Sequence, residues 1–142
     1  MAALTQPRNT PELLGSVHHG DVAAGVTIYQ GALLCRDAAG NVTPGATATG
    51  LVGIGRAEET VDNSGGAAGD ATVRYASGVF RFENSGGDPI DKSHIGGKAY
   101  VVDDQTVAAT DGTGTRSPAG VIEKVDAQGV WVRLDEALTA NI

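Results

Sequence analysis

Cysteine is nearly absent from this sequence, in which Cys35 is the only one. A single cysteine excludes a disulfide within the chain and any metal site built from several cysteines. Because Cys35 follows the apolar segment Gly-Ala-Leu-Leu at residues 31–34, we expect it to be a small buried residue. Aromatic residues make up only 4% of the chain, so the core must be built mainly from small aliphatic side chains.

Positive charge and long hydrophobic runs are also scarce. The chain has 10 basic and 17 acidic residues, which gives a formal net charge of −7. Since no segment combines clustered Lys or Arg with aromatics, we predict that nucleic acid is not a partner. No apolar run approaches the ~20 residues of a membrane helix, and the first residues lack the apolar stretch of a signal peptide. We therefore expect a protein made and kept in a cytosol, with no membrane partner.

Residues 1–25 differ from the rest of the chain because they contain Pro7 and Pro11 and show no alternating apolar pattern. We predict that they form an N-terminal arm, and that residues 26–142 form one β-rich domain. Within the arm, residues 10–15 combine a capping Thr, a Pro at the first helical position and a terminal Gly, which predicts a single helical turn. No substantial helix is expected elsewhere.

From residue 26 onward, short runs rich in Val, Ile and Tyr alternate with turn residues, a pattern typical of antiparallel strands. The predicted strands are residues 26–29, 32–36, 50–57, 71–75, 78–83, 98–102, 106–109, 119–126 and 129–134. So many short strands predict an all-β fold, a small antiparallel β-barrel or sandwich with an extended N-terminal arm and little helix. Residues 58–70 and 84–97 are rich in Gly, Asp and Ser and are predicted to be surface loops.

The two halves of the β-rich region are similar in outline. Residues 29–37, 42–43 and 53–54 correspond to residues 100–104, 106–107 and 120–121. An old duplication would explain this similarity. The spacing drifts between the halves, however, and chains of short strands generally look alike, so both interpretations stay open.

The densest group of possible metal ligands is His18-His19-Gly20-Asp21. Zinc could use two imidazoles and a carboxylate. Adjacent side chains on an extended strand point to opposite sides, however, and no third ligand is identifiable nearby, so no metal site is predicted.

Catalytic chemistry is not expected either. The glycine-rich residues 63–70 and 111–117 lack the Lys-Ser or Lys-Thr pair of a phosphate-binding loop. His94 lies in a loop, and the acidic pairs Glu58-Glu59 and Asp103-Asp104 do not converge with a base or nucleophile in the sequence. We therefore predict no enzyme activity, no catalytic residues and no cofactor. The single Trp131 could be a core anchor or an interface residue, and the core is the favoured alternative.

Several glycine-punctuated strands resemble those of the head decoration (cement) proteins of tailed bacteriophages. The segments that carry this resemblance are residues 25–33 (GVTIYQGAL), 50–55 (GLVGIG), 69–80 (GDATVRYASGVF), 97–107 (GKAYVVDDQTV), 119–122 (AGVI) and 129–134 (GVWVRL). The resemblance implies a β-rich homotrimer, made in the bacterial host cytoplasm, on the outer surface of the virion head. It also implies that an N-terminal arm binds the major capsid protein. The candidate contacts in that arm are Leu4, Pro7, Arg8, Leu13 and Leu14.

The expected function is therefore structural, namely to stabilise the assembled capsid by bridging major capsid subunits. Two alternatives remain open. The chain could be a tail or baseplate component of a phage, or a small β-rich module that binds a carbohydrate or other ligand through residues 58–70 and 84–97.

Overall fold

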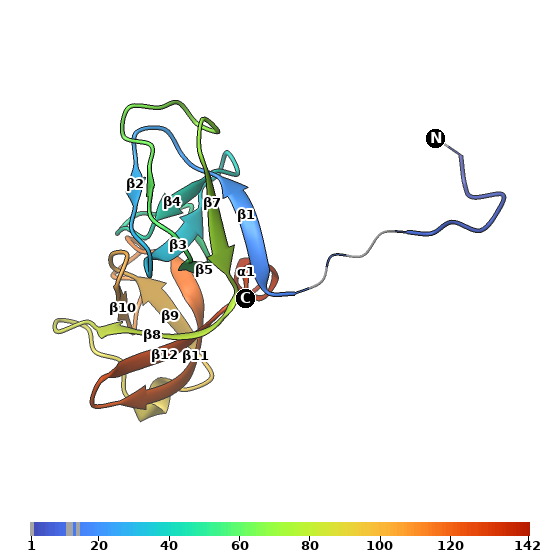
Figure 1. Ribbon diagram of the computed structural model, residues 1–142. Coiled ribbons are helices and arrows are strands. Elements are labelled where there is room, and N and C mark those ends of the chain that lie inside the picture. The colour runs from blue at the N-terminus through green and yellow to red at the C-terminus, as the bar shows by residue number, and fades with distance from the viewer. Residues whose placement is uncertain (1, 11–12, 14) are drawn as a thin grey trace.

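The computed structural model describes residues 2–10, 13 and 15–142, and most of its regular structure is β-strand (Figure 1). The strands are β1 (Val17–Asp21), β2 (Thr27–Ile28), β3 (Leu33–Arg36), β4 (Val42–Pro44), β5 (Val52–Ala57), β6 (Val61–Asp62), β7 (Thr72–Ala76), β8 (Gly78–Asn84), β9 (Lys98–Val101), β10 (Thr106–Ala108), β11 (Pro118–Asp126) and β12 (Gly129–Leu134). The helical elements are the 3-10 turn η1 (Lys92–His94) and the short helix α1 (Glu136–Ala140). The predicted all-β fold with a barrel and little helix is confirmed. No helix in the described part of the chain is long and apolar enough to cross a bilayer.

The strands form two main units. The N-terminal sheet has the order β1-β7-β5-β3-β4, and the C-terminal barrel closes in the order β10-β8-β12-β11-β9. A small sheet, β2-β6, lies beside the N-terminal sheet (Figure 1). The edges of the N-terminal sheet meet at one parallel bridge, where Val22 pairs with Val42 and the Ala23 amide donates to the Val42 carbonyl at 2.9 Å. The N-terminal sheet is thus curled almost into a second barrel.

The two units have the same topology. Taken in chain order, β1, β3, β4, β5 and β7 of the sheet occupy the places of β8, β9, β10, β11 and β12 in the barrel. Every pairing between neighbouring strands is antiparallel in both units except the last, which is parallel in both. The closing contacts also correspond, since Val22 pairs with Val42 and Asn84 pairs with Val107. The two halves of the chain therefore share a strand topology.

Backbone hydrogen bonds show how closely the two units match. The Gly31 amide donates to the Ala57 carbonyl at 2.9 Å, and the Gly96 amide donates to the Ile122 carbonyl at 2.8 Å. Both glycines have positive φ, 92° and 89°, which is the left-handed region that favours glycine. The same shift in residue number relates Gly31 to Gly96, Ala57 to Ile122 and Val42 to Val107. It also relates Cys35 to Tyr100 and Gly55 to Gly120. The residue pairs taken from the sequence, which were Tyr29 with Tyr100, Val42 with Thr106 and Gly53 with Gly120, are therefore not structurally equivalent.

Strand β3 is shared by two hydrophobic clusters. Leu33 and Cys35 pack into the cluster centred on the C-terminal barrel, whereas Leu34 and Ala32 pack into the cluster of the N-terminal sheet. This follows from the alternation of side chains along a strand, which gives β3 two apolar faces. Strands β5 and β11 also meet closely, because a Cβ atom at Gly53 would lie 2.1 Å from the Ala119 carbonyl oxygen. The two units therefore form one continuous body.

The segment predicted as an arm, residues 1–25, includes a strand of the folded body. Strand β1 pairs with β7 along its whole length, and Val22 behind it is fully buried. This strand could not be predicted, because its sequence His-His-Gly-Asp shows no alternation of apolar and polar residues. Its pairing depends on close packing at Gly20, where a Cβ atom would lie 2.5 Å from Val42 Cγ2. The predicted helical turn at residues 10–15 lies largely outside the described residues.

Four further elements were not predicted, and one of them is η1, which falls within the predicted surface loop 84–97. The short strands β4 and β6 lie in segments too short and polar to show a pattern, and β6 falls within the predicted surface loop 58–70. Helix α1 begins after Asp135, whose carboxylate accepts a hydrogen bond from the Leu138 amide at 3.0 Å. This is the normal role of Asp at a helix N-cap.

Candidate interaction surface

The described residues that precede β1, to which the name arm is restricted from here on, are exposed to solvent throughout. Leu4 and Leu13 are 71% and 84% exposed, and Pro7 and Arg8 are exposed as well. Figure 1 shows this segment leading away from the body before β1 begins. Four of the five residues predicted as binding contacts therefore present their side chains to solvent, and the fifth, Leu14, lies outside the described residues.

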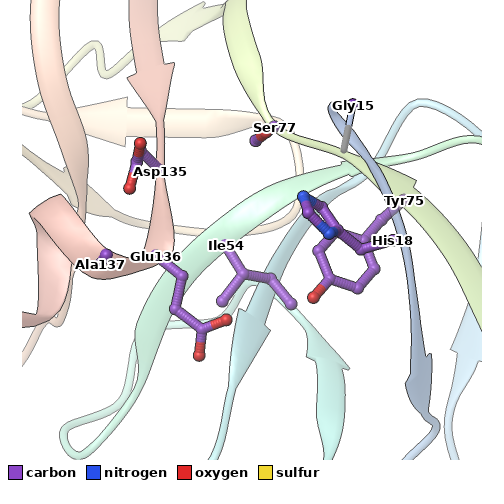
Figure 2. A pocket seen from close by; sticks show the side chains of 8 residues that line it. All are labelled: Gly15, His18, Ile54, Tyr75, Ser77, Asp135, Glu136 and Ala137. Atoms are coloured by element: carbon purple, nitrogen blue, oxygen red, sulfur yellow. The ribbon is translucent and has the colours of Figure 1, made fainter. Parts of the chain in front are cut away.

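The arm joins the body at Ser16, whose carbonyl accepts a hydrogen bond from the Ser77 amide at 2.9 Å. A cleft of about 330 Å³ lies at this junction (Figure 2). Its walls come from β1, β5, β7 and the start of α1, and they include His18, Ile54, Tyr75 and Glu136. The rings of His18 and Tyr75 lie 5.4 Å apart between centroids, at 38° to one another. The surface where the arm joins the body is therefore concave, with both apolar and polar walls.

An ion pair fixes one wall of this cleft. Arg36 donates from Nε to Glu136 Oε2 at 2.5 Å and from Nη2 to Glu136 Oε1 at 3.0 Å. The same Nη2 atom also lies 3.0 Å from the Tyr75 hydroxyl, to which it donates. The hydrogen bond to Glu136 is the main reason why the pKa of Arg36 is raised. This two-pronged contact holds α1 against β3 and β7.

A second, partly exposed surface lies along β8, where Arg56 of β5, Phe80, Arg81 and Trp131 line one pocket and Phe80 also packs against the barrel core. The guanidinium of Arg56 sits 4.2 Å from the centre of the Phe80 ring, while Arg81 and Lys124 lie 5.8 and 6.0 Å from the centre of the Trp131 ring. We call these five residues the Trp131 face. Cations at such distances are attracted to the ring quadrupole.

Trp131 itself is half-buried on the outer surface of β12, between the fully buried Val130 and Val132. Its indole Nε1 donates to Asp126 Oδ2 at 3.1 Å, and this hydrogen bond is the main cause of the lowered pKa of Asp126. The favoured prediction of a core anchor is therefore wrong. The strand alternation places the two valines inside the barrel and the tryptophan outside.

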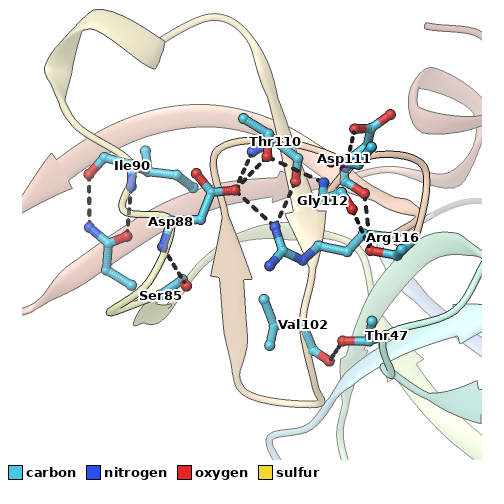
Figure 3. A network of polar contacts seen from close by, with 12 residues as sticks. Thr47, Ser85, Asp88, Ile90, Val102, Thr110, Asp111, Gly112 and Arg116 are labelled. Atoms are coloured by element: carbon cyan, nitrogen blue, oxygen red, sulfur yellow. Dashed lines mark hydrogen bonds and ion pairs between the residues drawn. The ribbon is translucent and has the colours of Figure 1, made fainter.

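The most extensive polar network joins two loops of the barrel (Figure 3). Asp88 accepts hydrogen bonds from Thr110 Oγ1 at 2.6 Å and from Arg116 Nη1 at 2.8 Å, and Arg116 Nη1 also donates to the Thr110 carbonyl at 3.0 Å. Hydrogen bonding from Thr110, followed by that from Arg116, lowers the pKa of Asp88. These bonds tie residues 84–91 to residues 110–116, although the buried Nε atom of Arg116 has no hydrogen-bond partner among the described residues.

The other candidate ligands and nucleophiles do not converge. His18 is half-buried and its neighbour His19 is exposed, as expected for adjacent positions of a strand. Within the described residues, no group of three or more His, Cys, Asp and Glu side chains could hold a metal ion. Cys35 is completely buried, and burial raises the pKa of its thiol to about 12, so the reactive thiolate is not formed near neutral pH.

The arm was predicted from its prolines and missing periodicity, whereas the cleft and the Trp131 face were not. Their residues come from strands far apart in the sequence, so no local motif marks them. No protein-family model, curated protein or solved structure matches this chain. Fold and surfaces therefore define an all-β protein with an exposed N-terminal arm.

Proposed function

We propose that this protein is a structural component of a bacteriophage head, which binds the outside of the assembled capsid and stabilises it by bridging major capsid subunits. The observation that carries this proposal is the exposed arm, in which Leu4 and Leu13 are mostly exposed while the body behind them is compact and β-structured. Large apolar side chains on a polar extended segment favour contact with another protein.

The energetics of such an arm favour attachment at several points. Ordering a flexible segment costs about 1–2 kcal/mol per residue for the backbone alone. Burying one leucine side chain contributes about 1.5–3 kcal/mol. A single arm therefore binds weakly. If the protein acts as a homotrimer, the second and third arms bind at high effective concentration, and the assembly attaches firmly.

The charge of the protein fits an external position. A net charge of −7 disfavours contact with the phosphate backbone of packaged DNA and favours a location outside the shell. Cementing follows from mass action, because a protein that binds only the assembled lattice shifts the equilibrium toward that lattice.

The test is a binding assay with undecorated, expanded phage heads. Wild-type protein should sediment with the heads, and the heads should resist heat or chelation better after binding. The double variant Leu4→Ser/Leu13→Ser should bind at least about tenfold more weakly, which corresponds to about 1.4 kcal/mol. Ile95→Ser is the matched control, because Ile95 is also an exposed apolar residue but lies outside the arm.

Wild-type protein that stays unbound at high concentration would refute the proposal. Equal binding by the arm variant and the control would refute the role of the arm. Electron microscopy of decorated particles gives the location directly, since a head protein produces regular knobs on the shell, whereas a tail or baseplate component does not.

A further inference from the structure

Two hollows meet at Gly31, between the small sheet and the Trp131 face. Their volumes are about 480 and 430 Å³, and each is within the range of small-molecule sites. The side chains that line them include Arg56, Phe80, Arg81 and Trp131 in the first hollow, and Tyr29, Gln30, Asp104 and Gln105 in the second. A Cβ atom at Gly31 would meet no atom within 4 Å, so no side chain separates the hollows at this point. We call the two hollows together the Gly31 groove.

The first hollow contains a cation that can bind an anion. Arg81 is exposed, donates to the neutral Gln128 side chain at 2.9 Å and has no carboxylate within ion-pair distance among the described residues. A guanidinium has five N–H donors, so most of those of Arg81 remain available. Arg56, by contrast, is paired with Glu58 at 2.6 Å and lies 4.2 Å from the centre of the Phe80 ring. Arg81 is therefore the anchor for an anionic group, and a carboxylate matches its planar fork.

The second hollow contains groups suited to hydroxyls. The side chains of Gln30, Asp104 and Gln105 make no hydrogen bond to the described residues, although their main chains do. Amides donate and accept hydrogen bonds, and a carboxylate accepts them. Tyr29, which is 63% exposed, adds an aromatic ring whose electron-rich face attracts the C–H groups of a sugar. Because Asp104 is acidic, this hollow favours a neutral group over a second anion.

Strand pairing and charge argue against a peptide or a nucleic acid in the groove. Strand β8 is paired with β10 and β12, and β12 is paired with β8 and β11, so no free strand edge lies along the Trp131 face. An extended peptide therefore cannot add its main chain to the sheet there. A nucleic acid carries a phosphate on every unit, which the net charge of −7 repels. A ligand with one carboxylate and neighbouring hydroxyls matches both ends of the groove.

We propose that the Gly31 groove binds an acidic oligosaccharide. The sugar that carries a carboxylate lies against Trp131, and its carboxylate accepts hydrogen bonds from Arg81. The neutral sugar next to it lies against Tyr29, and its hydroxyls bond to the side-chain amides of Gln30 and Gln105. The groove lies outside the arm and outside both predicted surface loops, so this binding activity is additional to the proposed function and does not depend on it.

The test is titration of the full-length protein with a hyaluronan tetrasaccharide, in which glucuronic acid alternates with N-acetylglucosamine. Tryptophan emission reports binding directly, because Trp131 is the only tryptophan and lines the groove. The dissociation constant should be about 1 mM or lower, with one site per chain by calorimetry. Chitotetraose, which has N-acetylglucosamine but no carboxylate, should bind at least about tenfold more weakly. Sialyllactose, titrated in parallel, distinguishes a sialic acid from a uronic acid as the acidic sugar.

Two variants locate the site. Arg81→Gln should weaken binding of the acidic sugar at least about tenfold, because it removes the charge and keeps a polar side chain. Tyr29→Ala, at the other end of the groove, should weaken it at least about threefold. Arg74→Gln is the matched control, because Arg74 is also an exposed arginine of a strand but lies outside the groove, and it should leave binding unchanged. Circular dichroism checks that each variant is folded, and Tyr29→Ala decides the test if Arg81→Gln unfolds.

Failure of both acidic sugars to bind at about 10 mM would overturn the inference. Equal binding of chitotetraose would overturn it as well, and so would Arg81→Gln protein that binds like wild type or Arg74→Gln protein that binds as weakly as Arg81→Gln. A glutamate-rich peptide that binds more tightly than the sugars, and requires Arg81, would make the groove a protein contact and end the sugar assignment. Head binding separates the two proposals. Protein that binds heads but neither acidic sugar overturns only the inference, whereas protein that binds the sugar and ignores heads overturns only the proposed function.

Discussion

Replacing Leu33 by alanine tests whether the two units fold as one. Leu33 is fully buried on β3 and packs into the cluster of the C-terminal barrel, although its own strand belongs to the N-terminal sheet. Its Cδ2 atom would lie 3.2 Å from a Cβ atom at Gly45, so the site is tightly filled. The substitution removes three carbons, worth about 0.8 kcal/mol each. With the cavity that remains, the free energy of unfolding should fall by about 3–5 kcal/mol.

The assay is equilibrium unfolding in urea, followed both by Trp131 fluorescence, which reports on the C-terminal barrel, and by circular dichroism, which reports on both units. The two signals should give one coincident transition in the wild type and in Leu33→Ala. Leu34→Ala, which acts on the other cluster, should shift the same transition. The control Leu138→Ala, at a side chain that is 37% exposed, should cost less than about 1 kcal/mol. Separate transitions for the two signals, or a loss below about 1 kcal/mol for Leu33→Ala, would refute the reasoning.

Three further outcomes are expected. Gly120→Ala should lower the free energy of unfolding by about 1–3 kcal/mol, whereas Gly65→Ala, which points into open space, should change it little in the same urea titration. Because the pKa of Asp88 is lowered in the folded state, its contribution to stability should be full above about pH 5 and disappear as the pH falls through about 4 and below, as measured by thermal melts. Asp88→Asn should make the loss of thermal stability at acid pH smaller, and an unchanged loss would contradict the prediction. Cys35 should react with a thiol reagent at pH 8 only after unfolding, and rapid labelling of the native protein would contradict this prediction.

Most strands could be predicted because their side chains alternate clearly. Strand β12 shows this best, since its valines point inward and Trp131 and Arg133 point outward. Strand β1 could not be predicted, because it owes its place to pairing with β7 and to the missing side chain at Gly20. Helix α1 is similar, since it is too short to be stable alone and depends on the contact between Glu136 and Arg36.

The surfaces were predictable only in part. Two prolines and the absence of periodicity mark the arm, and these are local properties of the sequence. The Trp131 face depends on Arg56 reaching Phe80 from another strand, and on a strand register that places Arg81 beside Trp131. Contacts of this kind arise from the topology, so they become visible only once the strand order is known.

The doubled topology affects how images of any assembly must be interpreted. Each polypeptide contributes two lobes of similar strand order, joined through β3. At low resolution, a ring of six such densities would therefore correspond to three chains, and its apparent sixfold outline would hide a threefold stoichiometry.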